Sequence, residues 1–217
     1  MDAHALQTEK QILKIKASKG LMWFGIISIT MLFAGLTSAY IVRQGEGKWV
    51  QFAIPQLFLV STILIVISSV TMQWGVQSIK HNNKKSLSLA ITLTALLGIG
   101  FVVFQYLSWS QLVSQGIYLV GQVKDINTTF QYIPSGKETA TDVGNTGNVA
   151  GSFLYVITGL HVVHLLGGMI AIFVVFSRAL MGKYSATDYN GVRMCAIYWH
   201  FLDGLWVYLY LFLLYIR

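Results

Sequence analysis

The chain is poor in charge: Asp, Glu, Lys and Arg make up 11% of its 217 residues, against about a quarter in a soluble domain. With 55% hydrophobic residues, this deficit excludes an ordinary soluble globule, and it also excludes disorder, which needs much charge. Two prolines and no Gly-X-Y period exclude a fibrous chain. The single Cys195 excludes a disulfide framework and a cysteine-based metal motif. A mean hydropathy of +0.62 points to a membrane.

The charge that is present is mostly positive, with 15 Lys and Arg against 8 Asp and Glu. In a soluble protein the resulting pI near 9.5 would suggest nucleic acid as a partner. Here the cations stand in short clusters between apolar runs, which is typical of membrane-flanking charge. We therefore expect no nucleic-acid binding.

Long stretches without any charge separate these clusters. Four of them hold between 23 and 38 residues, and in the last one, after Arg193, the only charge before Arg217 is Asp203. A helix needs about 20 apolar residues to cross the hydrocarbon core, so each stretch holds one span and none comfortably holds two. The sequence predicts an all-α integral membrane protein with five transmembrane helices, at Leu21–Val42, Phe52–Ile79, Ser86–Leu112, Val149–Phe176 and Met194–Ile216.

The distribution of cations predicts the orientation of this bundle. Ten fall on the N-terminal side of the spans and five on the other, which favours the N-terminus inside and the C-terminus outside. Residues 1–20 then form a cytoplasmic segment, residues 21–217 form one transmembrane domain, and the polar segment at about 113–148 forms a periplasmic loop. Between a plain surface loop and a docking surface for this segment, we favour the loop.

Polar residues recur along one stripe of each of the last two spans. Thr158, His161 and His164 follow one another at intervals of three, and His161 lies about 16 Å from the start of its span. In the last span the stripe comprises the polar and aromatic residues His200, Asp203, Trp206 and Tyr210, with Trp199 beside it. Packed antiparallel, the two helices would bring their stripes to overlapping depths.

Three interpretations of these stripes remain open. The first is a haem or metal site, although two histidines at i and i+3 on one helix cannot act as opposing axial ligands. The second is a proton path, which a lone carboxylate supports weakly. The third, which we favour, is a structural polar network or a contact with lipid or a partner subunit. On this interpretation the chain has no catalytic and no metal-ligating residue.

Small residues in the spans predict close helix packing. Gly35 and Ala39 form one small-xxx-small pair, and Gly159 and Gly167 are further candidates. The sequence contains no Walker loop, no HExxH, no Gly-x-Ser-x-Gly and no dinucleotide fingerprint.

Two C-terminal motifs resemble a known family. The stretch YWHFLDGLWVYLYLFLLY from Tyr198 resembles the last-helix signature of subunit III of haem-copper oxidases, and TGLHVVHLLGG from Thr158 resembles the segment that precedes it. The first span resembles the third helix of seven-helix members, so the chain resembles the five-helix bacterial form from about Leu21. Two residues depart from the family pattern: Ile29 stands where relatives often have a buried Glu, and Arg193 stands where many have Glu.

The resemblance implies a non-redox core subunit of an aa3-type cytochrome c oxidase in a bacterial inner membrane. Such a subunit packs on catalytic subunit I, with subunit II and other respiratory subunits nearby. It holds phospholipid and supports oxygen access, proton uptake and stability during turnover. Haem and copper would lie in the partner subunits, and this chain would carry no cofactor of its own. The chain would belong to an enzyme, a proton-translocating oxygen reductase, without holding its catalytic centre.

Other assignments remain possible on the sequence. The same position could exist in a quinol oxidase or in a complex associated with nitric oxide reductase. A small membrane transporter is a different class of function, although the spans show no paired broken helices. A dihaem electron carrier is the third.

Overall fold

The computed structural model describes residues 3–45, 49–51, 53–120, 131–132, 141–142, 149–186 and 188–216. Five long helices dominate it, and all five are long and apolar enough to span a membrane. They are α1 (Ala3–Gln44), α2 (Leu57–Lys80), α3 (Lys84–Ser114), α4 (Val149–Leu180) and α5 (Asn190–Tyr215). The prediction of an all-α membrane protein with five spans is confirmed.

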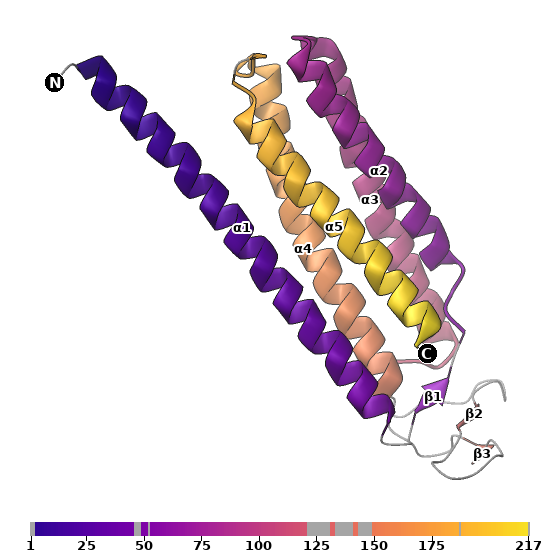
Figure 1. Cartoon of the computed structure of the whole chain (residues 1–217). Coiled ribbons are helices and arrows are strands. Elements are labelled where there is room, and N and C mark those ends of the chain that lie inside the picture. The colour runs from indigo at the N-terminus through magenta and orange to yellow at the C-terminus, as the bar shows by residue number, and fades with distance from the viewer. Residues whose placement is uncertain are drawn as a thin grey trace.

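Helices α2 to α5 form a four-helix bundle, with α1 packed against one edge of it (Figure 1). Around the bundle α2 contacts α3, α3 contacts α4, α4 contacts α5, and α5 contacts α2. Among the described helices, α1 contacts only α4 and α5. The two ends of the chain lie at opposite ends of the molecule, and α1 diverges from the bundle towards its own N-terminus (Figure 1).

The bounds of several helices differ from those expected. Helix α1 is continuous from Ala3, so the expected N-terminal segment is largely helical. The 42 residues of α1 extend about 63 Å. Helix α2 begins at Leu57 rather than Phe52 because Pro55, which has no backbone N–H to donate, stands in the entering turn. Helices α3 and α4 each extend past the expected limits, to Ser114 and Leu180.

Left-handed residues end three of the helices. Asn82 after α2 (φ 56°), Gly116 after α3 (φ 84°) and Gly182 after α4 (φ 68°) allow the following N–H to reach back to the last turn. After α4, for example, Lys183 N–H donates to the Arg178 carbonyl at 3.1 Å. The α2–α3 turn also caps α3, because Ser86 N–H donates to the Asn83 side chain.

A small antiparallel sheet joins two of the connections at the C-terminal end of the bundle (Figure 1). Its three strands have two residues each and run in the order β1 (Val50–Gln51), β2 (Gln131–Tyr132) and β3 (Thr141–Asp142). Both β2 and β3 come from the polar segment predicted at about 113–148, much of which lies outside the described residues.

The bundle buries a mixed aromatic and hydroxyl core and leaves apolar side chains on its outside. In the most apolar window of each span, between 22% and 39% of residues are buried. Outward side chains include Phe24, Met31 and Ile170, each at least two-thirds exposed. A soluble protein would bury such residues, so these surfaces suit contact with lipid or with another apolar helix.

The close helix contacts do not occur at the predicted small residues. Around Gly35, Gly159 and Gly167 the described part of the chain leaves open space, and Ala39 is exposed. Each of the four residues faces away from the neighbouring helices, so among the described residues they bring no helices together. Their role in packing stays a prediction for contacts with another chain.

The tight positions are instead Gly98 and Gly168, which enclose the Trp199 indole from two sides. A Cβ atom at Gly98 would lie 3.0 Å from the indole and 3.1 Å from the Met169 sulfur. At Gly168 the corresponding distances to Trp199 and Leu202 are 3.2 to 3.3 Å.

We expect Gly98→Ala to destabilise the bundle by about 1–3 kcal/mol, because the methyl group would displace Trp199 or Met169. Gly100→Ala on the same helix is the matched control, since its Cβ would meet Leu64 at an ordinary 3.6 Å. Denaturant unfolding in mild detergent measures both. Equal stability of the two variants would show that Trp199 is not tightly enclosed.

Candidate functional site

The polar stripe of α5 faces the inside of the bundle. Trp199 and Trp206 are fully buried, Asp203 is 3% exposed, and His200 is half-buried at the α2 side. The stripe meets α2 along its length, and α2 supplies the hydroxyl groups that the sequence analysis did not single out.

Three indole N–H groups are bonded to hydroxyl oxygens on other helices. Trp199 donates to Ser68 at 3.0 Å and Trp206 donates to Thr62 at 2.9 Å, both from α5 to α2. Trp109 of α3 donates to Thr158 of α4 at 3.1 Å. Each of these bonds joins neighbouring helices across the core.

Each accepting hydroxyl also donates its own proton within its helix. Thr62 donates to the Phe58 carbonyl at 2.7 Å, and Ser68 donates to the Ile65 carbonyl at 2.7 Å. Thr158 donates to the Leu154 carbonyl at 2.8 Å. A hydroxyl that donates backwards and accepts an indole N–H leaves neither group unpaired in an apolar interior.

His161 is enclosed by aromatic rings. It is fully buried, and its ring centroid lies 5.0 Å from Trp206, 5.8 Å from Phe101 and 6.5 Å from Phe33. Within the described part of the chain neither ring nitrogen has a hydrogen-bond partner.

His164 occupies a different environment one turn further along α4. Its Nδ1 bonds the Leu160 carbonyl of the same helix at 2.7 Å, and its ring lies 5.8 Å from Phe33 of α1. Tyr198 donates its hydroxyl proton to the His164 carbonyl at 3.4 Å. The residue therefore takes part in the contact between α1, α4 and α5.

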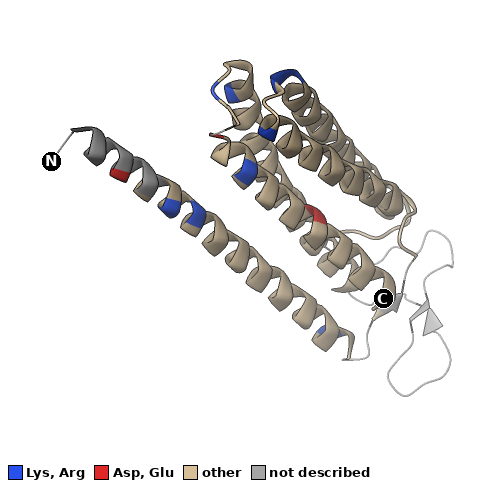
Figure 2. Ribbon diagram, turned by 45° about the horizontal axis from the view of Figure 1, so that its top comes forward, with Lys and Arg blue, Asp and Glu red and all other residues tan. Residues whose placement is uncertain are grey.

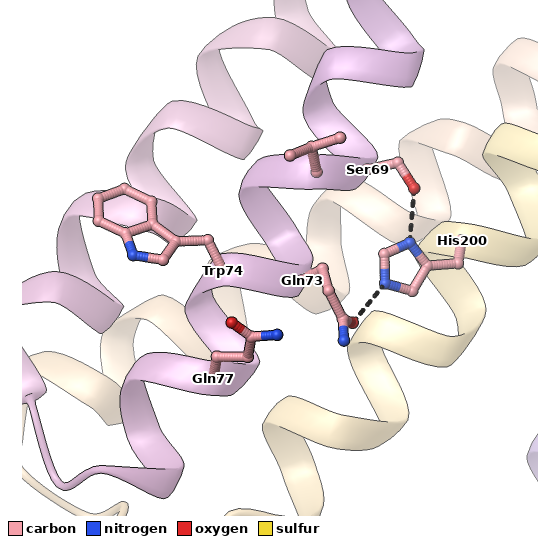
Figure 3. Close-up of a pocket in the computed structure, with 6 residues that line it drawn as sticks. Ser69, Gln73, Trp74, Gln77 and His200 are labelled. Carbon is pink, nitrogen blue, oxygen red and sulfur yellow. Dashed lines mark hydrogen bonds between the residues drawn. The ribbon is translucent and has the colours of Figure 1, made fainter.

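His200 faces α2 rather than the other two histidines. Its Nδ1 lies 2.6 Å from the Ser69 hydroxyl, and its Nε2 lies 3.3 Å from the Gln73 side-chain oxygen (Figure 3). The structure thus separates the three histidines, and across residues 3–216, apart from the gaps named above, no three His, Cys, Asp or Glu side chains gather as metal ligands.

Asp203 is the one acidic residue buried among the described side chains. Neither of its carboxylate oxygens has a hydrogen-bond partner there, although Ser69 of α2 lies beside it. Trp199, His200 and Trp206 of the same stripe each have a partner, so this carboxyl stands out among them.

The cations gather at the end of the bundle where α2 ends and α5 begins (Figure 2). This basic rim, as we call it, comprises the exposed residues Lys80, Lys84, Lys85, Arg178, Lys183 and Arg193. Tyr184 lies in the α4–α5 connection at this rim. Burial raises the pKa of its hydroxyl, and the nearby Arg178 partly opposes that rise. The rim matches the side that the sequence analysis assigned to the cell interior.

The enclosure of His161 leads to a prediction about its chemistry. Replacing it with Leu, an apolar residue of similar volume, should cost less than about 1.5 kcal/mol, because the imidazole gives up no hydrogen bond. His161→Ala should cost about 2–5 kcal/mol, because it opens a cavity between the three aromatic rings.

Denaturant unfolding of the two variants in detergent provides the comparison. If His161→Leu were as destabilising as His161→Ala, the imidazole nitrogens would have a partner that the geometry does not show.

Comparisons with known proteins place the chain in a family. The family model described as Cytochrome c oxidase subunit III matches residues 115–217. Over 199 residues the chain is 30% identical to cytochrome c oxidase subunit 3 of Thermostichus vulcanus. This match covers 88% of this chain and 83% of the relative. It is 29% identical to the subunit 3 of Corynebacterium diphtheriae, covering 86% and 82% of the two chains.

A human relative shows how far the similarity extends. The chain is 27% identical over 209 residues to cytochrome c oxidase subunit 3 of Homo sapiens, covering 88% of this chain and 68% of the human one. The five spans, the two C-terminal motifs and these matches agree with the sequence resemblance. The chain is a multi-pass membrane protein that belongs to the cytochrome c oxidase subunit III family.

Proposed function

We propose that the chain is the non-redox core subunit III of an aa3-type cytochrome c oxidase in a bacterial inner membrane. In this role it packs directly on catalytic subunit I, next to subunit II, and holds phospholipid. It supports oxygen access, proton uptake and the stability of the complex during turnover. Haem and copper belong to the partner subunits.

The single observation that supports the non-redox assignment is that the buried polar side chains join the helices of this chain to one another. The buried indoles and hydroxyls bond to one another across helices, and the three histidines point to three different surroundings. A redox subunit needs side chains that converge on one centre. A bundle whose polar groups join its own helices suits a supporting subunit.

The outside of the bundle supports the proposed contacts with lipid and a partner. Apolar side chains cover the outward faces of the spans, and α1 presents three outward apolar residues at its basic end, Leu21, Trp23 and Phe24. Cations of the basic rim attract the anionic headgroups of the inner leaflet. This arrangement also favours the orientation with the N-terminus inside.

Purification in mild detergent through a tag on this chain tests the assignment. We expect a haem-copper catalytic subunit to co-purify, with the haem absorption belonging to that subunit. Recovery of this chain alone, from membranes that contain the oxidase, would contradict the proposal. Haem bound to the isolated polypeptide would contradict its non-redox part.

Asp203→Asn should shorten the active lifetime of the complex, or lower its assembly, more than it changes the initial rate of oxygen reduction. The reason is that Asp203 lies in the interface of α5 with α2, where a change of polarity affects helix contact. Oxygen uptake followed from the first seconds through sustained turnover separates the two effects.

Asp188→Asn is the control, because Asp188 is an exposed carboxylate in the α4–α5 connection. An assembled Asp203→Asn complex without any oxygen reduction would give this residue a role in the reaction itself.

A further inference from the structure

A groove that contains a row of polar side chains lies between α2 and α5 on the outside of the bundle. Its volume is about 460 Å³, and it is lined by Ser69, Val70, Gln73, Trp74, Gln77 and His200 (Figure 3). Three of the five α2 residues are polar and repeat every four positions, so they form one row along the helix. We call this feature the α2–α5 groove.

The row spans a large part of one leaflet. Gln77 is three residues from Lys80 at the end of α2, or about 5 Å along the axis. Ser69 is eleven residues from Lys80, or about 16 Å, which is half of a hydrocarbon core about 30 Å thick. Polar groups therefore extend from the basic rim to about the middle of the membrane.

The hydrogen bonds inside the groove join Ser69, His200 and Gln73. A neutral His200 with its proton on Nε2 donates to Gln73 and accepts the Ser69 hydroxyl proton at Nδ1. One tautomer thus satisfies both contacts. Ser69 in turn lies beside Asp203, so the row ends at the buried carboxyl.

Lipid is a poor occupant for this groove. Gln73 and Gln77 are both exposed, and an amide in hydrocarbon without a partner costs about 2–7 kcal/mol. Val70 and Trp74, both exposed, line the same groove, so the polar row lies among apolar side chains. The two amides are therefore the groups that need a polar occupant.

Water suits the groove by size and by chemistry. A water molecule needs a space with two to four polar partners, and the volume exceeds the roughly 30 Å³ that one molecule occupies in the liquid. Asp203, whose carboxyl oxygens are buried and lack a partner within the described chain, lies behind Ser69 rather than in the groove lining.

We propose that the α2–α5 groove is a water-filled inlet that opens at the basic rim and ends at Ser69 and His200. Water from that side of the membrane reaches these two side chains past Gln77 and Gln73, and the proton of Asp203 exchanges with this water through the Ser69 hydroxyl beside it. The inlet is a property of this chain and does not depend on which complex contains it.

Reaction of introduced cysteines with a membrane-impermeant thiosulfonate tests the inlet in membranes that contain the assembled complex. Cys195 is the only native cysteine, and Cys195→Ala removes it. In this background Gln77→Cys, Gln73→Cys and Ser69→Cys are labelled from each side in turn. Since only a hydrated thiol ionises to the reactive thiolate, we expect all three to react from the basic-rim side, at rates that fall with depth.

Ile67→Cys is the matched control, because it lies about 3 Å from Ser69 along the axis but is 46% exposed on the apolar face. Ser69→Cys should react at least about tenfold faster than Ile67→Cys. Adding Gln73→Leu should slow labelling at Ser69→Cys while leaving Gln77→Cys unchanged. Equal rates at positions 69 and 67 would overturn the inlet and indicate that lipid or a neighbouring subunit fills the groove.

Infrared spectroscopy provides a measurement that needs no cysteine. The carbonyl band that disappears in Asp203→Asn should shift to lower frequency soon after transfer to D₂O, and a band that stays unshifted would overturn the inlet. Labelling from the side opposite to the one assigned to the cell interior would support the inlet but contradict the proposed membrane orientation. Failure to co-purify with subunit I would leave the labelling result unaffected.

Discussion

Polar side chains inside a membrane protein must find their partners within the protein, because hydrocarbon offers none. In this bundle helix α2 meets that requirement for α5. Its hydroxyls at Thr62 and Ser68 each accept an indole N–H from α5 and donate their own proton to the α2 backbone. These bonds fix the depth of Trp206 and Trp199 against α2. The glycines of α3 and α4 that enclose Trp199, and the rings that enclose His161, depend on that placement.

Helix α1 is attached to this core by aromatic contacts rather than by hydrogen-bonded networks. Phe33 lies against both histidines of α4, and Tyr40 packs on Trp49, Phe153 and Phe212 near the C-terminal end of the bundle. Ile29, one turn before Phe33, faces the core at the position where relatives often have a glutamate. Because Ile29 is apolar, α1 supplies no carboxylate at this depth in the bundle. The contact of α1 with α4 and α5 depends on shape complementarity and buried apolar area.

The five spans could be predicted because charge is absent from long stretches, a signal that needs no tertiary information. The start of α1 could not be predicted, because a charged extension beyond a span has no apolar signal. The α5 stripe was predictable from Asp203 and His200, which are unusual in lipid. The partners of this stripe on α2 could not be predicted, because Ser and Thr are common in spans and usually bond their own backbone, as Thr71 and Thr92 do here. The small-xxx-small pairs do not tell which helices meet within the chain, because such pairs are frequent by chance.

His161 and Asp203 are both buried without a partner in the described chain, yet their surroundings imply different states. Aromatic rings enclose His161 on several sides, and no polar row leads to it, so the site stays dry and the imidazole acts as a ring that packs against other rings. Asp203 lies beside Ser69, at the end of a row of amides and an imidazole that extends to the basic rim. A carboxyl beside such a row lies one hydroxyl away from the water of the proposed inlet. The difference between the two residues therefore lies in the helix that each one faces: α5 turns Asp203 towards the polar side of α2, whereas α4 turns His161 towards aromatic rings.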